Sequence, residues 1–177
     1  IETSFEESVL STFGIRGEGQ IPPTLAGLTA SLDLDLDHVP TEWLRADPVY
    51  LLADRNGLIL FDSETVGLEE NEADCLIELL NDGLAADGIT LKRGISASRW
   101  YVSMSNVGTT WSHSPRALSG QAIEPHSGDL RQSVELKRLM TSVQMLLHQS
   151  PVNAYRESEE KRPVNSVWLW GFGTLPL

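Results

Sequence analysis

The feature that most constrains the fold of this chain is an apolar segment close to its C-terminus. Between Val164 and Trp170 the sequence predicts a strand with Val167 and Leu169 on one face and Trp168 beside Trp170 on the other. A strand that is apolar on both faces has to be covered on both, which is typical of a central strand. We therefore expect this strand to lie inside a sheet and to stop at the Gly-x-Gly turn that follows it.

Hydrophobic periodicity and turn signals predict the other elements. Apolar residues recur at helical spacing within 4–14, 22–32, 69–84 and 129–148. Strands are expected at 89–91 and 99–104, and Asn56-Gly57 between two apolar runs predicts a β-hairpin over 48–61. Residues 105–129 have no convincing period, and a loop of this length is usually functional or mobile.

Helices and strands alternate without a regular βαβ repeat, so we predict an α+β (mixed α/β) fold, a β-sheet with helices packed on it. A length of 177 residues is typical of one domain with a substantial core. We expect a single compact domain over 1–177, in which 1–42 is an N-terminal helical segment and 43–177 forms the α/β core.

Composition restricts the classes of partner. The net charge of −12 argues against nucleic acid, because neutralising phosphates requires clustered Lys and Arg. No apolar run approaches the roughly 18 residues of a membrane helix, so we expect no membrane partner and a cytoplasmic location. The single cysteine, Cys75, cannot form an internal disulfide, and its helical pattern predicts a core position.

Three polar residues near the C-terminus, Asn153, Arg156 and Asn165, are the best candidates for a ligand site. Arg offers a planar fork that fits phosphate or carboxylate, and Asn both donates and accepts, so together they could clamp a phosphorylated or carboxylated metabolite. The alternative is structural. In that interpretation Asn153 caps a short helix after Pro151, and Asn165 ties the Pro163 turn to the strand.

A second candidate site precedes the longest predicted helix. Backbone N–H groups at a helix start attract anions, and His126 with Arg131 could add positive charge there. The alternative is a capped helix with an exposed histidine.

The patterns for metal and covalent chemistry are incomplete. The alternating carboxylates of 33–37 resemble the start of a calcium loop, but His38 and Leu44 stand where its Gly and its closing Glu belong. The Ser112-His113-Ser114 run supports no triad, because neighbours on a loop do not face one another by default. We therefore expect no catalytic residues, no metal site and no cofactor.

The C-terminal quarter also carries a family resemblance. Its residues 144–148, the Pro-Val-Asn of 151–153, Arg156 and the run 163–176 are similar in order and spacing to a pattern of the bacterial RpfE-type regulatory proteins. The segment 43–49 resembles another part of that pattern. That family in turn resembles the inserted domain of the archaeal-type cofactor-independent phosphoglycerate mutases. In the mutase-like domain an arginine opens a strand, and Arg99 stands at the matching place, which implies a ligand contact; the alternative is a surface arginine stacked on an aromatic ring.

Two departures limit what the resemblance implies. Ser150 stands where both patterns have a histidine, and Trp170 stands where the mutases have an arginine, so a phosphate contact by that arginine is missing. The mutase reaction also needs a metal core that the residues of this chain do not supply. We expect a non-catalytic, RpfE-type regulatory protein that binds a small anionic ligand or a protein partner. The alternatives are a mutase-like or phosphoesterase enzyme that needs segments outside this chain, and a structural module that forms a homodimer.

Overall fold

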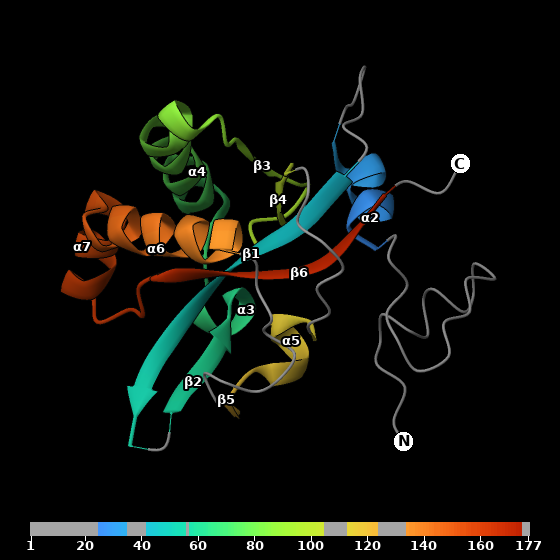
Figure 1. Cartoon of the computed structure of the whole chain (residues 1–177). Helices are drawn as coiled ribbons and strands as arrows, with labels where there is room; N and C mark the ends of the chain where they lie inside the picture. The colour runs from blue at the N-terminus through green and yellow to red at the C-terminus, as the bar shows by residue number, and fades with distance from the viewer. Residues whose placement is uncertain (1–24, 35–41, 56, 105–112, 124–133, 175–177) are drawn as a thin grey trace, which may run out of the picture.

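One long strand, β1 (Glu42–Asp54), organises the sheet (Figure 1). The computed structural model describes residues 25–34, 42–55, 57–104, 113–123 and 134–174. Strand β1 pairs antiparallel with β2 (Gly57–Asp62), with β4 (Trp100–Val102) and with β6 (Ser166–Thr174). Beyond these, β3 (Leu91–Arg93) pairs with β4, and β5 (Ala122–Ile123) pairs with β2, so the described residues form a sheet of six strands.

The proline inside β1 is tolerated because of where it lies. Pairing with β4 involves Leu44 and Arg45, and pairing with β2 begins at Val49. Pro48 therefore lies between the part of β1 that pairs with β4 and the part that pairs with β2. On the side of β1 that faces these two strands, its missing N–H interrupts no backbone hydrogen bond. The predicted hairpin over 48–61 is confirmed, and its first strand starts earlier than the sequence indicates.

The closing strand β6 differs from the prediction in two ways. Among the described strands β6 pairs only with β1, so β1 and not β6 holds the central position. The strand also continues past the glycines to Thr174, through an irregularity in register opposite the Trp43–Arg45 segment of β1. Gly171 has φ +65° there, a conformation that a side chain would strain, which is why glycine suits the bulge.

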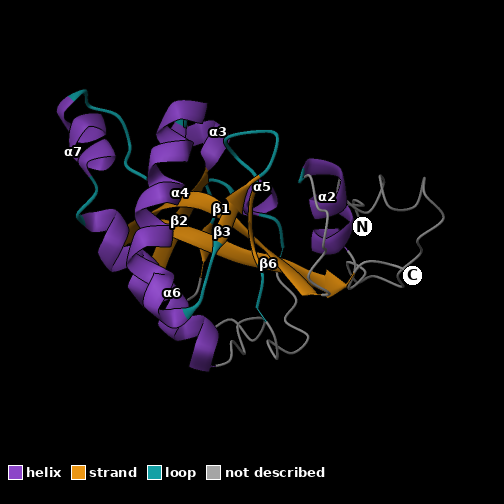
Figure 2. Ribbon diagram, turned by 90° about the horizontal axis from the view of Figure 1, so that it is seen from above, coloured by secondary structure: helices purple, strands orange, loops and turns teal. Residues whose placement is uncertain are grey.

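One face of the sheet is covered by a helical layer (Figure 2). Its helices are α3 (Ser63–Val66), α4 (Glu70–Leu84), α6 (Val134–His148) and α7 (Pro151–Ser158), and the short helix η1 (Ala85–Asp87) extends α4. Helix α4 begins with a capping box between Glu69 and Glu72. Val167 and Leu169 of β6 pack into this larger core. The predicted helix over 69–84 is confirmed.

The opposite face is covered by α2 (Leu25–Asp33) and α5 (Pro115–Leu118). Trp168 and Trp170 lie in a second cluster with Leu25 of α2, so the predicted division of the β6 side chains between two faces is confirmed. A third cluster joins α2 to Trp43 and Tyr101. The sheet with helices on both faces confirms the predicted α+β class.

The structure corrects some of the expectations, and others concern residues outside the described part of the chain. Cys75 is exposed, so the prediction of a core position is wrong: the buried face of α4 is formed by Ala73, Leu76, Leu80 and Leu84, and Cys75 falls beside the face. The loop over 105–129 contains α5 and β5, which the sequence did not predict. The predicted helix over 4–14 and the start of the helix over 129–148 lie outside the described residues. No helix in the described part of the chain is long and apolar enough to cross a membrane.

Candidate functional site

Arg156 lies on α7 and is completely buried. Its Nε donates to the carbonyl oxygen of Arg162 at 2.8 Å, and its Nη2 donates to the carbonyl oxygen of Val66 at 2.6 Å. Its Nη1 pairs with the Glu72 carboxylate and also reaches the Gly67 carbonyl oxygen. All three nitrogens of the guanidinium are therefore bonded to the protein, and they join α7 to the end of α3 and the start of α4.

Asn153, one turn earlier on α7, is also buried. Its Nδ2 donates to the carbonyl oxygens of Leu147 and Val164, at 2.8 and 2.7 Å, and its Oδ1 accepts from the N–H of Val164 at 2.9 Å. The side chain therefore links the end of α6 to the residue that leads into β6. Helix α7 is capped by Ser150 instead, whose hydroxyl accepts from the N–H of Val152, so the interpretation of Asn153 as the cap is wrong.

Asn165 extends the pairing of β6 with β1 through its side chain. Its Oδ1 accepts from the N–H of Leu51 at 2.8 Å, and its Nδ2 donates to the carbonyl oxygen of the same residue at 2.9 Å. The carboxamide thus takes the place of a backbone peptide just beyond the last paired residues, Val49 and Ser166. Asn153, Arg156 and Asn165 make contacts within the protein, but Asn153 does not form the helix cap that the structural alternative expected. Binding of a ligand by these residues stays a prediction.

A buried ion pair that the sequence did not single out lies on β1. Arg45 donates to both carboxylate oxygens of Asp47, at 3.0 and 2.8 Å, and its guanidinium lies 5.1 Å from the ring of Trp170 and 5.3 Å from that of Tyr101. The indole N–H of Trp170 donates to Asp47 at 2.7 Å, and the N–H of Trp100 lies 3.3 Å from it. Burial raises the pKa of the Asp47 carboxyl, and its four donors oppose that effect. Arg45 and Asp47 are two residues apart on a strand, which puts both side chains on one face. This spacing is the sequence signal that could have indicated the ion pair.

Trp170 thus has a defined role at the position where the mutase pattern has an arginine. Its indole N–H completes the set of donors to Asp47, and its ring covers Arg45. An arginine at this position would place a second cation beside Arg45.

Arg99 precedes β4 and keeps part of its side chain in solvent, with an exposed fraction of 31%. Its Nε lies 3.0 Å from the carboxylate of Asp33 at the end of α2, although the N–H is not directed at that oxygen. The same carboxylate oxygen accepts from the hydroxyl of Tyr101 at 2.7 Å. Asp33 is thereby engaged inside the protein, whereas part of the Arg99 side chain reaches solvent. The aromatic stacking considered for Arg99 is not among the ring contacts of the described residues.

The remaining candidates bring no chemistry together in the described part of the chain. His126 and Arg131 lie outside it, as do Asp35, Asp37 and His38 of the incomplete calcium pattern. Within 25–34, 42–55, 57–104, 113–123 and 134–174, no group of three His, Cys, Asp or Glu side chains could hold a metal ion.

The fold is of a known class. It matches the cofactor-independent phosphoglycerate mutase of Thermoplasma acidophilum with a TM-score of 0.56 and 19% identity, over 96% of this chain and 47% of that one. At this identity the match establishes the fold alone.

Sequence comparison identifies related proteins. The chain is 29% identical over 127 residues to the 2,3-bisphosphoglycerate-independent phosphoglycerate mutase of Methanosarcina mazei, which covers 71% of this chain and 32% of that protein. It is 28% identical over 147 residues to the probable mutase of Geobacter sulfurreducens, covering 83% and 37%. The chain therefore spans about a third of the length of these relatives, and it is similar to the inserted domain of such mutases. No protein-family model matches the chain.

Proposed function

We propose that this chain is a non-catalytic regulatory protein of the RpfE type, which uses the fold of the mutase inserted domain to bind a small phosphorylated or carboxylated metabolite or a protein partner. The observation that carries the proposal is the internal bonding of the shared motif. Arg156, Asn153 and Asn165 direct their polar atoms at the protein itself, so the likeness to mutases in this quarter of the chain is explained by folding. A motif that stabilises the fold is retained even in a chain that does not catalyse the mutase reaction.

We assign binding of the anion to Arg99, His126 and Arg131. Among the described residues, Arg99 is partly exposed and lies beside the Asp33 carboxylate, and His126 with Arg131 completes the set from the sequence. An arginine fork suits a phosphate or a carboxylate. The proposal places the protein in the cytoplasm without nucleic acid or membrane partners, in keeping with its net charge of −12.

A thermal-shift titration with 3-phosphoglycerate, 2-phosphoglycerate and inorganic phosphate tests this binding. A ligand at 100 times its Kd adds about 2.7 kcal/mol to the free energy of unfolding, which is several degrees for a chain of this size. We expect a rise in Tm that is lost in Arg99→Ala and in Arg131→Ala. Arg116→Ala is the matched control, because Arg116 is 69% exposed in a surface pair with Glu64. An unchanged Tm with all three anions would reject binding of a phosphorylated metabolite.

The second candidate is a mutase-like or phosphoesterase enzyme that needs segments outside this chain. The observation in its favour is that the sequence relatives are named as phosphoglycerate mutases and extend well beyond the matched part. A full-length reading frame that carries Asp and His metal ligands on either side of residues 1–177 would decide for the enzyme.

A further inference from the structure

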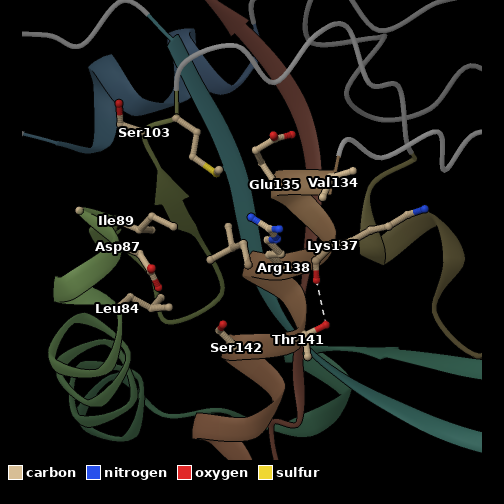
Figure 3. Close-up of a pocket in the computed structure, with 13 residues that line it drawn as sticks. Leu84, Asp87, Ile89, Ser103, Val134, Glu135, Lys137, Arg138, Thr141 and Ser142 are labelled. Atoms are coloured by element: carbon tan, nitrogen blue, oxygen red, sulfur yellow. Dashed lines mark hydrogen bonds between the residues drawn. The ribbon is translucent and has the colours of Figure 1, made fainter.

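The carboxylate of Asp33 lies beside the described arginine to which anion binding is assigned. Its Oδ2 is 3.0 Å from Nε of Arg99 and accepts from the hydroxyl of Tyr101 at 2.7 Å. The Asp33 side chain is only 1% exposed, although it belongs to the last residue of α2. The contact is separate from the groove of about 780 Å³ between the end of α4 and the first half of α6 (Figure 3), because neither Asp33 nor Arg99 lines that groove.

The β3–β4 hairpin makes room for this carboxylate. A Cβ atom at Gly94 would collide with Oδ2 of Asp33 and would lie 3.0 Å from the ring of Tyr101. The N–H of Gly94 donates to the carbonyl oxygen of Arg99 at 2.7 Å, which keeps the glycine and the arginine opposite each other on the hairpin. Burial raises the pKa of the Tyr101 hydroxyl, so this group stays protonated and donates at neutral pH. Gly94 and Tyr101 therefore place the carboxylate without help from the Arg99 side chain.

The contact between Asp33 and Arg99 is one of charge without a directed hydrogen bond. The Nε–H of Arg99 is buried and has no acceptor within the described part of the chain. A carboxylate that held an arginine in position would accept this N–H, as Asp47 does from Nε of Arg45 at 3.0 Å. Asp33 instead supplies a negative charge beside the cation, and a second anion at Arg99 has to bind against that charge.

We propose that Asp33 is an internal competitor for the anion site at Arg99, so that binding of an external anion and docking of the end of α2 oppose each other. The inference rests on the proposed function, because it takes Arg99 as an anion contact, and it adds the regulation of that site. The coupling is reciprocal: an anion at Arg99 loosens the last turn of α2, and weaker docking of this turn strengthens anion binding. Leu32 is 75% exposed, so it adds little to the packing that holds the turn in place.

Titration of the ¹⁵N-labelled chain with inorganic phosphate, followed by NMR, measures the competition. Asp33→Asn removes the charge and keeps the size of the side chain and an acceptor for Tyr101. We expect this variant to bind phosphate about tenfold more tightly than the parent chain, because one negative charge near the anion is gone. The gain should disappear in the double variant Asp33→Asn with Arg99→Ala. Glu64→Gln is the matched control, since it also removes one acid from an arginine pair, with Arg116 on the surface, and it should bind like the parent.

Hydrogen exchange in the parent chain measures the coupling without any substitution. The N–H of Leu34 bonds to the carbonyl oxygen of Ala30 at 2.9 Å and reports on the last turn of α2. We expect saturating phosphate to speed its exchange several-fold in the parent chain and to leave it unchanged in Asp33→Asn.

The results distinguish this inference from the proposed function. Absence of phosphate-induced shifts in the parent chain and in Asp33→Asn alike would reject anion binding itself. Phosphate that binds the parent chain through Arg99 and binds Asp33→Asn with equal affinity would overturn the competition and leave the proposed function in place. Weaker binding to Asp33→Asn would also overturn it, because Asp33 would then position Arg99 for the ligand. Exchange at Leu34 that phosphate does not change in the parent chain would contradict the coupling to α2.

Discussion

Replacing Arg156 with alanine is expected to lower the free energy of unfolding by about 3–5 kcal/mol, the range for breaking a buried charge pair. The substitution removes a fully buried side chain and leaves the carbonyl oxygens of Val66 and Arg162 without their donor. It also removes the cation that faces Glu72. Urea unfolding followed by circular dichroism measures the change, and Tm should fall by on the order of 10 °C.

Arg116→Ala is again the matched control, since its ion pair with Glu64 is on the surface. Exposed pairs of this kind contribute about 0–1 kcal/mol. Arg156→Lys should be nearly as destabilised as the alanine variant, because one ammonium cannot reproduce the fork that reaches three separate segments. An Arg156→Ala protein as stable as Arg116→Ala would contradict the structural role and return Arg156 to the list of ligand contacts.

Replacing Asp47 with alanine is expected to cost a similar amount, about 3–5 kcal/mol. The guanidinium of Arg45 would remain buried without its carboxylate, and the indole N–H of Trp170 would lose its acceptor. Asp54→Ala supplies the control, because Asp54 is exposed at the end of the same strand. It should change the free energy of unfolding by less than about 0.5 kcal/mol.

The double variant Arg45→Met with Asp47→Leu distinguishes the unpaired charge from lost packing. Replacing both partners of a buried pair by apolar residues is often close to neutral, so most of the stability lost in Asp47→Ala should return. A double variant as unstable as Asp47→Ala would show that the cost arises from packing and not from the uncompensated Arg45.

Local signals in the sequence were enough for much of the fold. The Asn56-Gly57 pair predicted the hairpin, and the acids at the start of the 69–84 segment fitted a helix that the structure closes with a Glu69–Glu72 capping box. The alternation in the last strand predicted which side chains enter each core. Each of these signals depends on residues within a few positions of one another.

What the sequence could not provide depends on contacts between distant segments. Arg156 reaches Val66 and Glu72, which lie 90 and 84 positions away, and nothing near Arg156 in the sequence indicates burial. An arginine beside two asparagines has the same pattern whether it clamps a ligand or ties helices together. Among the described strands β6 pairs with β1 alone, and this too depends on topology. A strand that is covered on both faces has the same composition whether it has one neighbouring strand or two.

The candidate site shows the same limit. Arg99 was singled out by resemblance, and the structure adds that Asp33 lies beside it and that part of its side chain is exposed.

The central claim is that the chain has the fold and the motif of a mutase inserted domain without its reaction. The most direct test is turnover of 3-phosphoglycerate to 2-phosphoglycerate by the purified chain with Mg²⁺ or Mn²⁺ supplied, beside a full-length cofactor-independent mutase under the same conditions. We predict no conversion above the buffer blank while the full-length mutase converts its substrate. Conversion that rises in proportion to the concentration of this chain and persists after repurification would contradict the claim.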